Sequence, residues 1–412
     1  MRTLPGGAAF AAVAVIALAL VASTADALAR VPPGAPDPGG SGAIVVDAAT
    51  GEVLLDENAD ESRAIASTTK LMTALLTLER ARLGETYTAV PYPALAAESR
   101  IGLRPGERMR VRDLLAALLL ESANDASATL AARIAGSRRA FVRLMNQRAR
   151  ELGLRSTSYA NPIGLDDPDN RSSARDLATL ARRLLRDRRF ARIVDRPSAE
   201  LRSGSRPRVV ANRNRLVRGH AFVDGVKTGH TRQAGYVLVG SASLRGARVV
   251  SVVLGEPSEA ARDADTLALL RWGLGRFRRV RVLDEDRAVA RAGVVGFDGR
   301  RVALSPARSA SATLRRGRGF SMRVEAPPEL TGPLPAGRRV GRVTIVHDGR
   351  AVRTVPVVTT AAVPEAGLLR RLDPGASFAV AAFALLAVGL AARALARRRA
   401  RRGRRRRATV AR

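Results

Sequence analysis

Two apolar segments, one near each end, confine the folded part of this chain to the residues between them. The first, residues 8–21, follows the basic Arg2 and precedes the small residues of Ala27-Leu28-Ala29. A basic start, a short apolar run and a small-x-small end are typical of a secretory signal peptide. We therefore predict a signal peptide at residues 1–29. An uncleaved anchor is the alternative, and either would export the chain that follows.

The second apolar segment, residues 376–396, has about the 20 residues that a membrane helix needs, and Arg393 is close enough to its end to reach the interface. The tail at residues 397–412 is dominated by Arg, and Arg-rich flanks remain on the cytoplasmic side. We therefore expect a single-pass protein of the plasma membrane, with an extracytoplasmic body and a cytoplasmic tail. Such a tail would also allow nucleic-acid binding, but an exported, tethered body argues against nucleic acid as a partner.

The net charge and the absence of Cys further limit the binding partners and the kinds of metal site that the chain can have. The formal net charge is +33, and a body this basic is attracted to anionic surfaces such as a cell envelope. The chain has no Cys, which excludes disulfides and thiolate metal sites. No other pattern suggests a metal site or a cofactor.

The exported body is long enough for two domains. After a Pro- and Gly-rich linker at residues 30–41, residues 42–279 combine strand patterns with apolar residues at helical spacing. Residues 280–360 instead contain short Val-rich segments between Gly and Pro, with Asp348-Gly349 as a hairpin signal. The sequence thus predicts an α/β domain, a small all-β domain and a linker at residues 361–375. The strands predicted in the first domain are 43–46, 52–55, 236–242 and 248–254, and its predicted helices are 70–82, 111–135, 140–152, 174–185 and 266–277.

Only two of the 70 basic residues are Lys, namely Lys70 and Lys227. The guanidinium of Arg stays protonated in a protein, whereas a Lys amine can lose its proton where the surroundings disfavour charge. We therefore interpret the two Lys as marking sites where an Arg could not replace them. The alternative is that these two Lys remain in the sequence by chance. Both lie in short motifs, Ser67-Thr68-Thr69-Lys70 and Lys227-Thr228-Gly229.

The first motif places a hydroxyl and an amine on one face of a predicted helix. Residues three apart share a helix face, so the Lys70 amine can reach the Ser67 hydroxyl. A serine hydroxyl is a weak nucleophile until a base removes its proton, and a buried Lys with a depressed pKa can be that base. The helix N-terminus adds free N–H groups that can stabilise an oxyanion. An isolated Ser-x-x-Lys is more often a capping Ser with a surface Lys.

Two further motifs follow in the order that this chemistry needs. Ser122-Ala123-Asn124 lies between helical stretches, where a second Ser can relay a proton and the Asn amide can hold a substrate amide. Lys227-Thr228-Gly229 precedes a predicted strand. Lys227 and Thr228 can bind a carboxylate, and Gly229 lets a substrate backbone approach the strand closely. Ser-x-x-Lys, Ser-x-Asn and Lys-Thr-Gly together are typical of β-lactamases and penicillin-binding proteins.

The chain resembles the D-alanyl-D-alanine carboxypeptidases, the low-molecular-mass penicillin-binding proteins, over about residues 42–360. The resemblance includes Asn161-Pro162-Ile163-Gly164-Leu165, the segment Ser172–Ala178 and the strand around Asp224–Thr231. It departs at Ala123, where Gly is common. The resemblance implies a β-lactamase/transpeptidase-like domain, with an antiparallel sheet flanked by helices, before a small all-β domain and a membrane anchor.

The resemblance also implies an activity: removal of the terminal D-Ala from peptidoglycan stem peptides through an acyl-enzyme, with inhibition by β-lactam antibiotics. Ser67 would be acylated with Lys70 as its base, and Ser122 would complete the proton relay with Asn124. On the substrate-binding side, the resemblance implies roles for Asn124, Lys227, Thr228, Gly229 and His230. Lys227 and Thr228 would hold the terminal carboxylate, and the backbone N–H groups of Ser67 and His230 would form the oxyanion hole.

Two kinds of alternative remain open. The same site could serve a DD-endopeptidase, a transpeptidase or a β-lactamase. A class A β-lactamase uses an additional Glu for deacylation, and residues 162–176 contain four Asp but no Glu. A non-catalytic penicillin sensor is the other alternative, and retention of every motif residue argues against it.

Overall fold

The computed structural model describes residues 34–95, 97–365 and 381–397. The predicted signal peptide, the start of the predicted membrane span at residue 376 and nearly all of the basic tail lie outside these ranges. Residues 381–397 form a helix. Within the described ranges, no helix is both long and apolar enough to cross a membrane.

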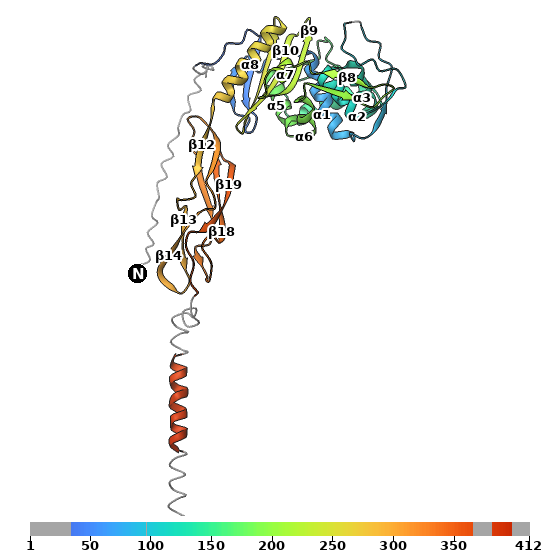
Figure 1. The fold of residues 1–412 in the computed structure, drawn as a ribbon. Helices are drawn as coiled ribbons and strands as arrows, with labels where there is room; N and C mark the ends of the chain where they lie inside the picture. The colour runs from blue at the N-terminus through green and yellow to red at the C-terminus, as the bar shows by residue number, and fades with distance from the viewer. Residues whose placement is uncertain (1–33, 96, 366–380, 398–412) are drawn as a thin grey trace, which may run out of the picture.

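A five-stranded antiparallel sheet organises the first and larger part of the molecule (Figure 1). Its strand order is β2-β1-β11-β10-β9, so the first two strands of the chain pair with the last three of this part. The helix α8 packs on one face and α5 on the other. The predicted antiparallel sheet flanked by helices is therefore confirmed. The strands are β1 (Gly42–Asp47), β2 (Val53–Glu57), β9 (Val223–Thr231), β10 (Gly235–Leu244) and β11 (Ala247–Glu256).

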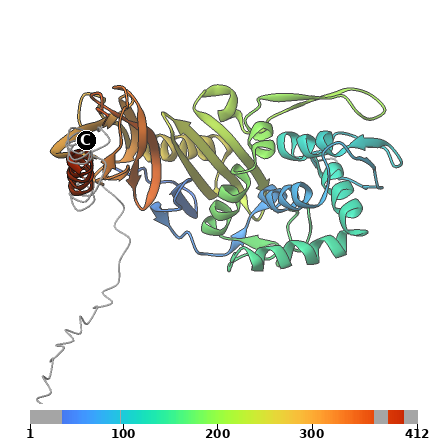
Figure 2. The same ribbon diagram turned by 90° about the horizontal axis from the view of Figure 1, so that it is seen from below.

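The helices α1 to α4 gather at the end of this part that lies away from the second part (Figure 2). The predicted helix 111–135 is interrupted. The helix α2 continues into a π-helical turn, which ends at Ser122, and α3 begins at Asn124. The apolar residues that suggested one long helix instead fill the core on both sides of this break. The helices are η1 (Ala66–Thr69), α1 (Lys70–Arg80), α2 (Val111–Ala116), η2 (Ala117–Glu121), α3 (Asn124–Ala135), α4 (Arg138–Glu151), α5 (Ala174–Leu185), α6 (Arg188–Val194), α7 (Arg215–Gly219) and α8 (Glu259–Gly275).

The helix α8 begins earlier than its apolar pattern indicates. The prediction began at residue 266, but the helix begins at Glu259 because Ser258 caps it, accepting a hydrogen bond from the Ala261 N–H at 3.0 Å. The predicted start was therefore wrong by about two turns. Short two-stranded pairs complete this part: β3 (Arg63–Ala64) with β6 (Arg171–Ser172), β4 (Thr86–Thr88) with β5 (Arg108–Arg110), and β7 (Ser198–Leu201) with β8 (Arg208–Ala211).

The second part is the predicted all-β region, and it has a core of its own. A six-stranded sheet has the order β16-β18-β19-β14-β13-β17, and β12 pairs with β15. The predicted hairpin is confirmed: His347 pairs with Arg350, and Asp348 and Gly349 both have the positive φ that this turn requires. The strands are β12 (Phe277–Leu283), β13 (Ala290–Val294), β14 (Phe297–Pro306), β15 (Ala310–Arg315), β16 (Ser321–Glu325), β17 (Glu329–Leu330), β18 (Arg339–His347) and β19 (Arg350–Thr359).

Candidate active site

Ser67 and Lys70 form a hydrogen-bonded pair where η1 passes directly into α1. Lys70 is the first residue of α1, and its Nζ donates to Ser67 Oγ at 2.9 Å. Ser67 is half-buried, whereas Lys70 is fully buried. The spacing of three residues thus gives the contact that the sequence predicts, with the hydroxyl nearer to solvent than the amine.

The Lys70 amine is held in a dry environment by the loop Asn161–Leu165. Its Nζ also donates to the carbonyl of Ile163 at 2.5 Å. Burial lowers the pKa of Lys70 well below its ordinary value, and the nearby charge of Lys227 lowers it further. A neutral amine has a lone pair that can accept the Ser67 proton, so this arrangement suits a general base.

Gly164 allows that loop to pass directly beneath the turn that carries Ser67. Its φ is +93°, and a Cβ there would lie 2.0 Å from the Ala66 carbonyl oxygen and 2.9 Å from the Ser67 nitrogen. Asn161 fixes the loop by accepting the Gly164 N–H with its Oδ1 at 2.7 Å. The Asn-Pro-x-Gly-Leu segment is therefore the support of the Ser–Lys pair, a role that its residue types alone did not indicate.

Ser122 lies in the break between η2 and α3 in a strained conformation. Its φ of 63° is left-handed, which is uncommon for a residue with a side chain. The residue is only 4% exposed, and its Oγ has no hydrogen-bond partner among the described residues. A buried hydroxyl held in this way is available to a group that enters the site.

The strand β9 supplies the opposite wall, because it lies against the turn of η1. A Cβ at Gly229 would lie 2.9 Å from the Ser67 nitrogen, so only Gly allows this approach. Lys227 is buried beneath the strand, and its Nζ donates to the Thr228 carbonyl at 2.8 Å. Burial lowers the pKa of Lys227 to about 7, and the charges of Arg213 and Arg262 contribute to the shift.

The predicted residues meet around one cleft of about 310 Å³. Ser67, Ser122, Thr228, Gly229 and His230 line it together, and the His230 ring stacks on Tyr236 with 4.0 Å between the ring centroids. Lys70, Lys227 and Asn124 are buried and do not line the cleft themselves. The other lining residues are Ala97, Ser99, Arg213, Arg215, Tyr236, Glu259 and Arg262.

Several of these cleft residues were not found by sequence reasoning. Arg213, Arg215 and Arg262 bring positive charge to the lining, but a single Arg gives no signal in a chain whose basic residues are almost all Arg. Glu98 was also missed: its Oε2 accepts from Asn124 Nδ2 at 2.7 Å, and it accepts a further bond from the Tyr92 hydroxyl. Glu98 lies in the irregular segment between β4 and β5, where no periodic pattern indicates a role.

A half-buried Ser paired with a buried Lys at a helix start, facing the edge strand of an antiparallel sheet, defines a serine acyl-transfer enzyme of the transpeptidase-like class. The comparisons with known proteins specify the family within that class. The family model described as D-alanyl-D-alanine carboxypeptidase matches residues 31–258, and the C-terminal domain of penicillin-binding protein 5 matches residues 277–365. The chain belongs to the D-alanyl-D-alanine carboxypeptidase family.

Curated relatives extend over most of the chain. It is 34% identical to D-alanyl-D-alanine carboxypeptidase DacC of Escherichia coli, over 80% of this chain and 85% of that protein. It is 30% identical to DacF of Bacillus subtilis, over 79% and 86% of the two chains. The predicted recognition, activity and enzyme class are thereby confirmed.

Solved structures have the same fold. Penicillin-binding protein 5 from Haemophilus influenzae has a TM-score of 0.56 and is 29% identical, covering 80% of this chain and 99% of that one. A Streptomyces K15 DD-transpeptidase variant also has a TM-score of 0.56 and 29% identity, covering 58% of this chain and 99% of that one. The first of these structures extends into the β region, which supports the order of an α/β part followed by a β part.

Proposed function

We propose that Ser67 is the nucleophile of this serine D-Ala-D-Ala carboxypeptidase and that Lys70 is its base. The observation that carries the assignment is the 2.9 Å contact between Ser67 Oγ and a fully buried Lys70 amine. Ser67 attacks the carbonyl of the penultimate D-Ala of a peptidoglycan stem peptide, and its proton passes to Lys70. The backbone N–H groups of Ser67 and His230 receive the developing oxyanion.

Collapse of the tetrahedral intermediate breaks the peptide bond and needs a proton on the departing amine. Ser122 is the relay, since its buried Oγ has no competing partner among the described residues. The terminal D-Ala leaves with that proton, and the penultimate D-Ala remains bonded to Ser67 as an ester. Water then attacks the ester, with Lys70 again accepting the proton, and this restores the free Ser67 hydroxyl.

Several groups hold the substrate during these steps. Thr228 lies in the cleft lining, and Lys227 supplies positive charge from below, so both act on the terminal carboxylate. Asn124 accepts a substrate amide N–H, and Gly229 leaves room for the peptide beside β9.

The test uses the purified full-length chain and a pentapeptide that ends in D-Ala-D-Ala. We expect release of free D-Ala, and no release from the matched peptide that ends in L-Ala. Ser67→Ala should abolish both the release and covalent labelling by a fluorescent penicillin, while the melting temperature stays close to that of the wild type. Labelling of Ser67→Ala at the wild-type level would remove Ser67 from this role.

A transpeptidase is the second candidate, because a DD-transpeptidase is among the solved structures of the same fold. The two reactions differ only in whether water or an amine takes the acyl group. Adding glycine to the assay distinguishes them, since a transpeptidase yields a new peptide bond in place of the free acid. If the protein is labelled by penicillin and then rapidly hydrolyses the bound antibiotic, it is a β-lactamase. If it is labelled but releases no D-Ala from the peptide, it is a sensor.

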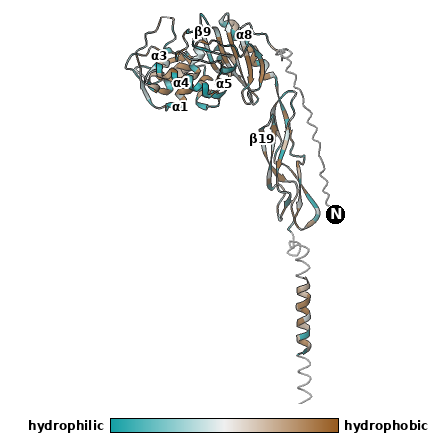
Figure 3. Cartoon of the chain, turned by 180° about the vertical axis from the view of Figure 1, so that it is seen from behind, coloured by the Kyte–Doolittle hydropathy of each residue, from teal (hydrophilic) through white to brown (hydrophobic). Residues whose placement is uncertain are grey.

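We also propose that residues 376–396 anchor the protein in the plasma membrane, with the catalytic part outside and the basic tail inside. The support is the apolar run in the sequence, and Figure 3 shows that the helical residues 381–397 are mainly hydrophobic. The full chain should remain in the membrane fraction after a high-salt wash. A chain of residues 30–370 should be soluble and still bind penicillin. Release of the full chain by salt alone would contradict the anchor.

A further inference from the structure

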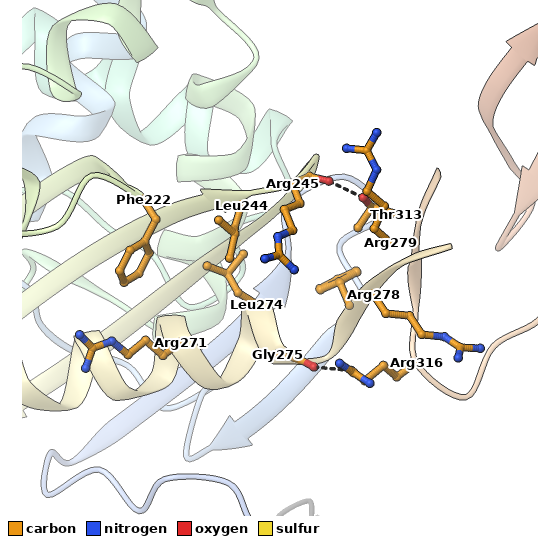
Figure 4. Close-up of a pocket in the computed structure, with 11 residues that line it drawn as sticks. Phe222, Leu244, Arg245, Arg271, Leu274, Gly275, Arg278, Arg279, Thr313 and Arg316 are labelled. Carbon is orange, nitrogen blue, oxygen red and sulfur yellow. Dashed lines mark hydrogen bonds between the residues drawn. The ribbon is translucent and has the colours of Figure 1, made fainter. Parts of the chain in front are cut away.

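A second cavity, distinct from the active-site cleft, lies where the α/β part meets the β part (Figure 4). Its volume is about 440 Å³. The end of α8, the turn between β10 and β11, β12 and the end of β15 all contribute to it. Two hydrogen bonds connect the parts beside it: Arg316 Nε donates to the Gly275 carbonyl at 2.8 Å, and the Thr313 hydroxyl donates to the Arg245 carbonyl.

The interior of this junction cavity is apolar. Leu274 is nearly buried, and the rings of Phe222 and Phe277 are partly buried against the core beneath it. Leu244, which also lines the cavity, is 49% exposed. Exposed apolar side chains around a concave surface are typical of a ligand site.

The rim of the cavity carries only positive charge. No Asp or Glu lies among its lining residues. None of its five Arg forms an ion pair with a carboxylate in the described part of the chain, although many other Arg do. Arg271 instead lies over the Phe222 ring, 5.9 Å from its centroid. Figure 4 shows their guanidinium groups spread around the opening instead of meeting at one point. The five are Arg245, Arg271, Arg278, Arg279 and Arg316.

The backbone at Arg245 has a conformation that is unusual for an Arg. Arg245 and Gly246 form the tight turn between β10 and β11, and Arg245 has a left-handed φ of 52°. Asn, Asp or Gly is normal in that position, because other side chains are strained there. The turn itself therefore gives no reason for an Arg at this position. Its position at the cavity gives one, because there the side chain adds a positive charge to the lining.

We propose that the junction cavity binds an acidic glycan of the cell envelope. The apolar face of a sugar ring would pack on the exposed Leu244 and on the part of the Phe222 ring that Arg271 leaves uncovered, as apolar surfaces do when they leave water. Carboxylate or phosphate groups along the glycan would pair with the guanidinium groups of the rim, which bind both kinds of anion in bidentate fashion. A single small anion would not satisfy five separated charges, and a polyanion without rings would leave the apolar interior unused.

Binding is measured by calorimetry on the full chain, in a neutral detergent without sugar groups and at a physiological salt concentration. The probes are a hyaluronan hexasaccharide, which carries carboxylates, a phosphomannan oligosaccharide, chitohexaose as the neutral glycan, and polyaspartate as the polyanion without rings. We expect either acidic glycan, or both, to bind at least tenfold more tightly than chitohexaose and polyaspartate. Which of the two binds identifies the acidic group. Equal affinity for polyaspartate, or no binding of either acidic glycan, overturns the proposal.

Matched variants separate the cavity from the general positive charge of the chain. Arg245→Gln with Arg279→Gln should weaken binding about tenfold or more, and Phe222→Leu should weaken it severalfold. The control is Arg338→Gln with Arg339→Gln, which removes the same charge from exposed positions outside the cavity. An equal loss in the control would show that only net charge matters. Penicillin labelling should be unchanged in every variant, so failure here leaves the proposed enzyme activity unaffected.

Discussion

Asn124 donates from its amide nitrogen to Glu98 Oε2 at 2.7 Å. A carboxylate can only accept, so this bond fixes which end of the Asn124 amide points toward Glu98. No group in the described part of the chain donates to the amide oxygen, which can therefore accept an N–H from a peptide substrate. Glu98 is itself held by the Leu95 N–H at 3.1 Å and by the Tyr92 hydroxyl. It is therefore a positioning residue for Asn124.

Glu98→Gln should lower kcat/KM for the pentapeptide by about tenfold, because Gln can present either end of its amide and no longer fixes Asn124.

A pH profile separates this effect from simple misfolding. Burial sets the low pKa of Lys70, and the Glu98 charge partly offsets it. Loss of that charge should therefore move the alkaline-activated limb of penicillin acylation to lower pH. Glu61→Gln, an exposed carboxylate paired with Arg63, is the control. An unmoved limb would contradict an electrostatic contact with Lys70.

Lys70→Arg tests whether the base must be able to lose its proton. Arg keeps the positive charge but stays protonated, so acylation by a fluorescent penicillin should fall by a factor on the order of 10³. The rate of labelling measured by rapid quenching gives the factor directly. The melting temperature must be followed as well, since the larger guanidinium enters a fully buried position. A folded variant that is acylated at nearly the wild-type rate would exclude Lys70 as the base.

Lys227 should control substrate affinity instead of the chemical step. Burial lowers its pKa to about 7, so in the free enzyme its positive charge is complete below that pH and is lost as pH rises through it. KM for the anionic pentapeptide should therefore increase above pH 7. Lys227→Arg, whose charge is permanent, should flatten this increase and be milder than Lys70→Arg. A loss of acylation as complete as that of Lys70→Arg would assign Lys227 to proton transfer.

The Ser–Lys contact could be predicted from sequence because both residues lie within one helical turn, where spacing determines distance. The residues that were missed act across long separations. Ile163 reaches Lys70 with a backbone carbonyl, which any residue type could supply, and Glu98 meets Asn124 from an irregular segment. The strained φ of Ser122 is set by the break in the helix and has no sequence pattern. The same distinction holds for the fold. The strand patterns of the first domain are local and were found, whereas the start of α8 was placed at residue 266, where its apolar pattern begins, and the Ser258 cap was missed.

Gly164→Ala should disable the site by displacing the turn that carries Ser67. The new Cβ would lie 2.0 Å from the Ala66 carbonyl oxygen, and the left-handed backbone alone costs roughly 1–2 kcal/mol. Gly102→Ala is a matched control, since Gly102 has a similar φ of +68° but nothing within 4 Å of the added Cβ. Both variants should lose some thermal stability, but only Gly164→Ala should lose penicillin labelling. Equal labelling in the two would show that the turn tolerates displacement.

Glu256 should make the folded state less stable as pH rises toward neutrality. The residue is 1% exposed. The negative charges of Asp265 and Glu57 raise the pKa of its carboxyl group, and a hydrogen bond from the Gly40 N–H lowers it. Burial, followed by the negative charge of Asp265, raises the pKa of Glu256 from 4.5 to about 7. Because the folded state holds this proton more tightly than the unfolded state, the stabilisation is complete below pH 4.5 and is lost between pH 4.5 and 7. Over that range the melting temperature of the wild type should fall, by on the order of a few degrees, relative to that of Glu256→Gln. Asp265→Asn is the second variant, and it should move the fall to lower pH because it removes the neighbouring charge. A difference between the wild type and Glu256→Gln that stays constant with pH would mean that the pKa of Glu256 is not raised in the folded protein.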